Sequence, residues 1–225
     1  MTRYVQFHDL SLYAMLNLDT IGSQNNTNGG TEAGKIRLFS AGPNDSASRQ
    51  LARMADFIGS YQALPLDIVV QDQVDREGRY GDHISFTNAG YPSMRFTEMV
   101  EDASRYHNSL DTIEGIEAGY LADATKTILG IVTALADGPH PPRNVSLRDN
   151  GNGMQTLVWE PVEGAVRYMV TARYPNSLVY DAQFVTIGAT SGEWDGWSQY
   201  EAVAIAAIDA NGLIGPFSVE YKIPR

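Results

Sequence analysis

The sequence predicts an α/β domain followed by an all-β domain. Before residue 138, short apolar segments alternate with segments of helical periodicity, whereas after residue 142 only strand-like segments separated by turn residues occur. Between these regions, Asp137-Gly138-Pro139-His140-Pro141-Pro142 contains three prolines and a glycine, which stop a helix and force an extended connection. The length of 225 residues fits two ordinary domains. We therefore expect domains at residues 1–138 and 143–225, joined by a linker at 139–142.

Strands and helices are expected to alternate in the first domain. The helix at residues 47–61 carries Leu51, Met54 and Ile58 on one face, and either Asp45 or Ser46 is its candidate N-cap. We expect the strand at residues 10–18 to be buried. The expected elements are strands at Leu10–Leu18 and Lys35–Ser40, a helix at Ala47–Tyr61, strands at Leu66–Gln71 and Tyr91–Phe96, and a long closing helix at Ile116–Ala136.

The second domain is expected to contain strands and no helix. Trp159 lies on an early strand, Tyr168 lies on the next, and Tyr200 begins a later strand that ends in a turn with Asp and Gly. These positions resemble a fibronectin type III module over residues 141–224, which implies a seven-strand β-sandwich that serves as a spacer or a binding surface. The expected strands are Asn144–Arg148, Gln155–Trp159, Val166–Arg173, Phe184–Ile187, Tyr200–Ile208 and Phe217–Ile223.

Composition and charge exclude several classes of function. Lys and Arg total 16 against 27 Asp and Glu, and a chain with a net charge of −11 cannot release phosphate counterions as nucleic-acid-binding proteins do. Because the chain has no cysteine, any metal must be held by His, Asp or Glu. No apolar run approaches the roughly 20 residues that cross a bilayer, and the first residues lack the pattern of a signal peptide. We expect neither a nucleic-acid partner nor a membrane span.

Asp19 is the first candidate functional residue. It follows the apolar segment Leu16-Asn17-Leu18 and precedes a turn that contains Gly22. A carboxylate at the carboxyl end of a strand in an α/β fold lies where such folds place their ligands. Taken by itself, the segment is also explained by an aspartate that stabilises the turn.

Two segments with histidine supply further candidates. Asp82 and His83 are neighbours ahead of a predicted strand, and by themselves we interpret them as a structural hydrogen-bonded pair. His107 lies in a predicted loop, with Asp111 four residues later. A loop imidazole can ligate a metal through one nitrogen while a neighbouring group orients the other. By itself, His107 is also explained as an ordinary surface histidine.

Together, these segments resemble the C-terminal half of metallopeptidase family 28, the zinc-dependent exopeptidases that include bacterial leucyl aminopeptidases. The resemblance covers about residues 3–137, in which the candidate segments occur in the family's order and are followed by one long helix. The strand entry Gly90-Tyr91-Pro92 is one of these segments, and the stretch from Arg95-Phe96-Thr97-Glu98 to Tyr106-His107 is especially similar to secreted bacterial members. The resemblance implies a partial zinc-exopeptidase fold, in which a sheet is flanked by helices.

The same resemblance implies a site with two zinc ions that share a bridging carboxylate and a water molecule. By this analogy Asp19 ligates one zinc ion and His107 ligates the other. Asp111 would then support the His107 loop, and Asp82 and His83 would shape the pocket wall. The implied substrate is a peptide with a free amino terminus.

The family also uses an upstream histidine, a bridging aspartate and an adjacent pair of glutamates, one of which is the general base. These residues have no counterpart here, and no glutamate precedes Glu32. Our first hypothesis is that the chain is the C-terminal portion of a longer, secreted aminopeptidase-like protein, which is inactive without the rest. An uncovered sheet would then bind the missing N-terminal half or another chain. The second hypothesis is a non-catalytic interaction or self-assembling scaffold protein built on the peptidase fold.

Overall fold

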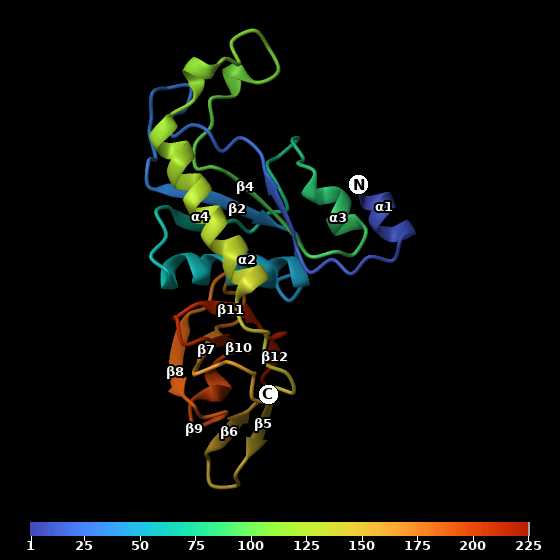
Figure 1. Cartoon of the computed structure of the whole chain (residues 1–225), viewed down its shortest axis with the longest axis vertical. Coiled ribbons are helices and arrows are strands. Elements are labelled where there is room, and N and C mark those ends of the chain that lie inside the picture. The colour runs from blue at the N-terminus through green and yellow to red at the C-terminus, as the bar shows by residue number, and fades with distance from the viewer. Residues whose placement is uncertain (225) are drawn as a thin grey trace. The chain divides into compact units, whose positions relative to one another are not determined.

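The computed structural model describes residues 1–224 (Figure 1). The chain forms two compact units, residues 1–130 and residues 131 onward. The division falls inside a long helix, α4, which spans Ala118–Asp137. The domain limits drawn from the sequence, and the linker at 139–142, stay predictions.

The first unit contains a four-stranded mixed sheet in the order β1-β4-β2-β3. Strand β1 is parallel to β4, β4 is antiparallel to β2, and β2 is parallel to β3. The core lies on the two central strands, where Ile36, Leu38, Met94 and Phe96 have no exposed surface. The strands are β1 (Met15–Leu18), β2 (Lys35–Ser40), β3 (Asp67–Val70) and β4 (Ser93–Glu98), and the helices are α1 (Thr2–Phe7), α2 (Ala47–Tyr61), α3 (His83–Asn88) and α4.

The two long helices form where the apolar spacing predicts them. Helix α2 buries Leu51, Met54 and Ile58, and Ser46 is its N-cap because its hydroxyl accepts a hydrogen bond from the Arg49 N–H. Hydrogen bonds join helix α4 to the sheet region of the first unit. The Tyr120 hydroxyl donates to the Lys35 carbonyl at 2.9 Å, and the Leu66 N–H donates to the Thr127 hydroxyl at 3.1 Å.

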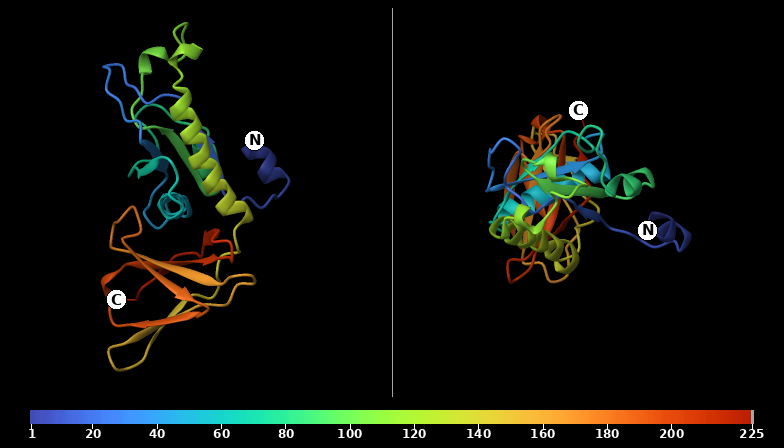
Figure 2. Two further views of the ribbon diagram at one scale, coloured as in Figure 1. Left: turned by 60° about the vertical axis from the view of Figure 1, so that its left-hand side comes forward. Right: turned by 90° about the horizontal axis from the view of Figure 1, so that it is seen from above.

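The start of the first unit differs from the sequence prediction. Of the strand expected at residues 10–18, only Met15–Leu18 is extended, and Leu10 and Leu18 are 46% and 47% exposed. The expected burial is wrong because β1 is an edge strand that pairs with β4 alone. Figure 2 shows α1 standing apart from the sheet at the end of an extended segment. The helix α3 was also not predicted, because its six residues are too short for a periodic pattern.

The second unit is a β-sandwich, as its strand pattern predicts. One sheet has the order β11-β10-β7-β8 with β12 paired to β10, the other has the order β5-β6-β9, and all pairs are antiparallel. Buried Trp159 and Tyr168 pack edge to face with ring centroids 5.5 Å apart. The described residues contain eight strands instead of the expected seven, because β9 was not predicted and two short strands, β11 and β12, take the place of the one expected at Phe217–Ile223. The strands are β5 (Ser146–Asp149), β6 (Gln155–Val158), β7 (Arg167–Arg173), β8 (Ala182–Ile187), β9 (Ser191–Trp194), β10 (Ala202–Ile208), β11 (Ile214–Phe217) and β12 (Tyr221–Lys222).

None of the helices within residues 1–224 combines the length and the apolar character that a membrane crossing requires.

Candidate functional site

The candidate site lies where β1 and β4 end. Because these strands are parallel, their carboxyl ends meet at the same edge of the sheet. Asp19 follows β1 directly, and its N–H donates to the Phe96 carbonyl at 3.3 Å. The Glu98 N–H, at the end of β4, donates to the Thr20 carbonyl at 2.7 Å. The sheet therefore places Asp19 and Glu98 side by side at one edge.

A buried arginine fixes the Asp19 carboxylate. Arg95 has no exposed surface, and its Nη2 lies 3.0 Å from Asp19 Oδ2. Its Nη1 donates to both carboxylate oxygens of Asp75, at 2.9 and 3.0 Å. Burial alone would raise the pKa of Asp75, but N–H donors from Gly81 and Arg76, together with the charge of Arg95, hold this pKa below its usual range. The charge of Arg95 is therefore shared between a buried carboxylate and the candidate ligand.

The turn that contains Gly81 makes room for this arginine. A Cβ at Gly81 would lie 2.4 Å from Asn17 Nδ2 and 2.9 Å from Arg95 Cδ. The turn also leads into α3, which begins at His83. The fully buried His83 ring bonds through Nε2 to the Val74 carbonyl at 2.7 Å, and its Nδ1 lies 3.9 Å from Asp75 Oδ2.

Asp82, at the N-cap position of α3, is exposed. Neither Asp82 nor His83 is among the residues that line the two cavities of this region. Their role as pocket-wall residues stays a prediction.

Three of the five residues selected from the sequence line one cavity. Asp19, at the end of β1, and His107 and Asp111, from one later loop, surround a volume of about 510 Å³. The remaining lining residues are Thr20, Arg76, Arg79, Tyr80 and Tyr106. The fold therefore brings together the carboxylate and the imidazole that the resemblance selects as metal ligands.

A left-handed backbone conformation occurs at one candidate ligand, His107, and immediately after the other, Asp19. Thr20, next to Asp19, has φ +57°, and His107 itself has φ +57°. A β-branched residue in this left-handed region costs on the order of 1–3 kcal/mol and persists only where its surroundings hold it. The Thr20 hydroxyl donates to the Asp19 carbonyl at 2.6 Å, and Thr97 Oγ1 donates to the Thr20 carbonyl at 3.1 Å. These bonds hold the turn that carries Asp19.

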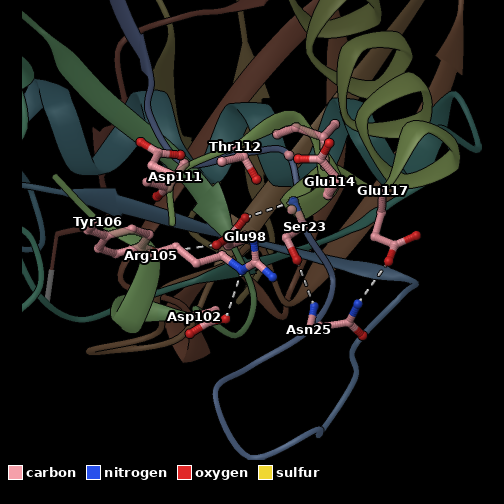
Figure 3. Close-up of a pocket in the computed structure, with 14 residues that line it drawn as sticks. Ser23, Asn25, Glu98, Asp102, Arg105, Tyr106, Asp111, Thr112, Glu114 and Glu117 are labelled. Atoms are coloured by element: carbon pink, nitrogen blue, oxygen red, sulfur yellow. Dashed lines mark hydrogen bonds and ion pairs between the residues drawn. The ribbon is translucent and has the colours of Figure 1, made fainter. Parts of the chain in front are cut away.

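A second cavity, of about 250 Å³, adjoins the first and shares Thr20, Tyr106 and Asp111 with it. Figure 3 shows its acidic lining around Glu98, which accepts hydrogen bonds from the Ser23 N–H at 2.9 Å and from the Tyr106 hydroxyl at 3.2 Å. Burial, opposed by these two hydrogen bonds, raises the pKa of Glu98 to about 7. The other labelled acids of this lining are Asp102, Asp111, Glu114 and Glu117.

Tyr106 lines both cavities. Its hydroxyl donates to Glu98 and, at 3.1 Å, to Glu101, and burial beside these two carboxylates raises the pKa of Tyr106. Its ring lies 4.9 Å from the guanidinium carbon of Arg79. Sequence reasoning did not assign Glu98, Tyr106 or Arg95 a role. For Arg95 and Glu98, the sequence did contain one indication of a functional role. Both are charged residues in the stretch Arg95-Phe96-Thr97-Glu98, which belongs to a fully buried strand.

The donor set is suited to zinc but insufficient by itself. A carboxylate oxygen and an imidazole nitrogen are both common zinc ligands, yet a structural or catalytic zinc site uses three or four protein ligands. Within the part of the chain that the structure describes, no group of three or more His, Cys, Asp or Glu side chains is placed to hold a metal ion. Asp19 and His107 therefore do not make a complete zinc site.

Comparison with known proteins agrees with this geometry. The sequence pattern of Peptidase family M28 matches residues 4–132, more than half of the chain. A "Probable zinc metalloprotease" from Pyrenophora teres f. teres is 30% identical over 177 residues, which cover 64% of this chain and 37% of that protein. A "Probable zinc metalloprotease" from Leptosphaeria maculans is 31% identical over 160 residues, 59% of this chain and 37% of that protein. The chain thus spans little more than a third of the length of these relatives.

Among solved structures, an aminopeptidase from Aneurinibacillus sp. strain AM-1 is similar over 59% of this chain and 29% of the aminopeptidase, with 22% identity and a TM-score of 0.39. The family match includes Asp19, His107 and Asp111, which line one cavity in the first unit, and the second unit has the two antiparallel sheets of a fibronectin type III sandwich. This chain belongs to peptidase family M28 and carries a fibronectin type III-like module after its peptidase-type unit.

Proposed function

We propose that this chain contributes part of the metal and substrate site of a dinuclear zinc aminopeptidase and is inactive by itself. The observation that carries the proposal is the cavity in which Asp19, His107 and Asp111 meet at the carboxyl end of β1. Asp19 would ligate one zinc ion and His107 the other. The remaining ligands and the general base would come from polypeptide outside these 225 residues, in keeping with the greater length of the relatives.

The chain's own residues would then hold and orient these two ligands. Arg95 pairs with Asp19 Oδ2, which leaves Asp19 Oδ1 for a metal. The strained Thr20 turn keeps the Asp19 backbone in place through its hydrogen bonds with Thr97. Supporting groups of this kind, which orient a ligand without touching the metal, commonly decide metal affinity.

The proposed substrate is a peptide with a free amino terminus. The carboxylates of Asp19 and Asp111 line the same cavity, and both attract an α-ammonium group. We further propose that the protein is secreted, which the acidic, cysteine-free composition and the appended β-sandwich support.

The test is to express the chain together with the residues that the codons upstream of residue 1 encode in its gene. We expect the extended protein to bind about two zinc ions, as dinuclear sites do, and to hydrolyse aminoacyl p-nitroanilides, while the 225-residue chain does neither. Zinc is measured by mass spectrometry. Asp19→Asn and His107→Gln should each lower the zinc content of the extended protein. The control Asp123→Asn, which alters an exposed carboxylate on α4 paired with Lys126, should not.

Two results would contradict this proposal. One is an upstream sequence without a His-x-Asp motif and without an adjacent Glu pair. The other is a stable, metal-free assembly of the 225-residue chain that gains neither zinc nor hydrolysis on extension. Either result would favour the alternative of a non-catalytic interaction or scaffold protein on the peptidase fold.

A further inference from the structure

We infer that the 510 Å³ cavity beside Asp19 and His107 receives an acidic side chain, so that the preferred peptide begins with Asp or Glu. The inference rests on the proposed function and adds the substrate class of the same site. It stands on the charges and contacts of the lining residues, above all on Arg79.

Arg79 is a cation without a carboxylate partner. The other arginine of the cavity lining, Arg76, pairs with Glu101 and lies 3.6 Å from Asp75. Arg95, behind the cavity, pairs with Asp75 and Asp19. Across residues 1–224, no Asp or Glu oxygen lies within ion-pair distance of the Arg79 guanidinium. Its positive charge is therefore available to a ligand.

The position of Arg79 leaves its donors free. The guanidinium carbon lies over the Tyr106 ring, 4.9 Å from the ring centroid. A cation–π contact of this kind uses the face of the ring as the partner, and the N–H donors of arginine remain able to bind a carboxylate in a bidentate fashion. Because the Tyr106 hydroxyl is held by Glu98 and Glu101, the ring is a fixed support for the guanidinium.

The opposite charge is also present. Within the described part of the chain, the Asp111 carboxylate has no hydrogen-bond or ion-pair partner, and only its backbone N–H is engaged, with the Asn108 carbonyl at 3.1 Å. Among the described residues, one carboxylate and one guanidinium without an ion-pair partner, those of Asp111 and Arg79, thus line the same cavity. An amino-terminal Asp or Glu matches this pair, because its α-ammonium can meet Asp111 while its side-chain carboxylate meets Arg79.

The rest of the lining disfavours an apolar first residue. Pockets that bind apolar groups are lined mainly by hydrophobic and aromatic side chains. This lining contains no aliphatic side chain and no phenylalanine, and its apolar surface comes from Tyr80, Tyr106, Thr20 and the arginine stems. A leucyl side chain would contact the tyrosine rings but would leave the charge of Arg79 without a partner, and a lysyl side chain would be repelled by Arg79.

The test compares two amides of nearly identical shape and different charge. L-Glutamic acid α-amide and L-glutamine amide are titrated separately into the isotope-labelled 225-residue chain, and NMR chemical-shift changes give each Kd. We expect the glutamic acid amide to bind about fivefold more tightly, the size of an exposed charge pair. Arg79→Gln should abolish the preference and Arg79→Lys should retain part of it. Arg148→Gln, the same charge change at an exposed position on β5, should leave it intact.

A third probe, the dipeptide Ala-Ala, carries its carboxylate at the chain terminus. Binding of Ala-Ala more tightly than the glutamic acid amide would overturn the inference in favour of a site for free carboxyl termini. Equal binding of the two amides would overturn it while leaving the proposed function intact. Failure of every probe to bind would also overturn it. Zinc content of the extended protein, which does not depend on this titration, decides the proposed function separately.

Discussion

Removal of the Asp75 carboxylate tests whether the buried network of Arg95 with Asp75 and Asp19 stabilises the first unit. In Asp75→Asn, Arg95 keeps only the half-exposed Asp19 as a carboxylate partner, while its guanidinium stays fully buried. Breaking a buried pair from one side typically costs about 3–5 kcal/mol, because a buried charge is left uncompensated. For a unit of this size, that loss lowers the melting temperature by roughly 10 to 25 °C.

The two units can be followed separately in one sample. Among the described residues, every α-helix lies within residues 1–137 and only the end of α4 passes residue 130, so the far-ultraviolet circular dichroism of the helices reports mainly the first unit. All three tryptophans, Trp159, Trp194 and Trp197, lie in the second unit, so their fluorescence reports that unit. We expect Asp75→Asn to lower the melting temperature read by circular dichroism.

The pH dependence gives the prediction a sign. The pKa of Asp75 is lower in the folded protein than its ordinary value. The stability that Asp75 contributes is therefore complete above its unfolded-state pKa and is lost as the pH falls through the folded-state pKa. Wild-type protein should lose this contribution in acid below about pH 4, and Asp75→Asn should lack that part of the acid transition.

The matched control is Asp123→Asn, which removes an ion pair with Lys126 in which both side chains are exposed, so that no buried charge is left behind. This change should cost less than about 1 kcal/mol. A loss of under about 1 kcal/mol for Asp75→Asn as well, with unchanged acid unfolding, would refute the reasoning about the buried network.

Three further changes test other contacts. Gly81→Ala places a methyl group 2.4 Å from a side-chain nitrogen and should cost about 1–3 kcal/mol by overpacking, measured by circular dichroism. Gly34→Ala, with no atom within 4 Å of the new Cβ, is its control. Glu98→Gln should flatten the pH dependence of stability, because the wild-type stability falls as the pH rises from the ordinary glutamate pKa through about 7; an unchanged pH profile would contradict this. Tyr168→Phe removes the oxygen that accepts the Val162 N–H at 2.8 Å and should cost about 1 kcal/mol, read by tryptophan fluorescence, whereas unaltered unfolding would mean that water replaces the bond.

Local patterns predicted the long elements of the fold. Helix α2 forms over the predicted residues because its apolar spacing, its N-cap at Ser46 and its length all favour a helix. Strand β2 likewise spans the predicted residues 35–40. Short elements escaped prediction, because six residues in α3 and four in β9 carry too little periodicity. The sequence pattern of residues 10–18 indicated burial, but an edge position in the sheet decided otherwise.

The site was predicted in part. Asp19, His107 and Asp111 were selected through the family resemblance, and the structure places all three around one cavity. The partners that orient them could not be found from spacing. Arg95 lies 76 residues after Asp19 in the chain and reaches it only because β1 and β4 pair in parallel.

By itself, the sequence determined the two types of architecture. Its net charge of −11 and its lack of cysteine also determined which classes of function are excluded and which residue types could ligate a metal. These follow from composition and from spacing within single elements. Only the tertiary structure decided which side chains share a cavity, which charges are paired, and that Arg79 remains without a carboxylate among the described residues. The pairing of charges depends on contacts between segments that are distant in the sequence. Strand order and packing, and not local sequence, determine those contacts.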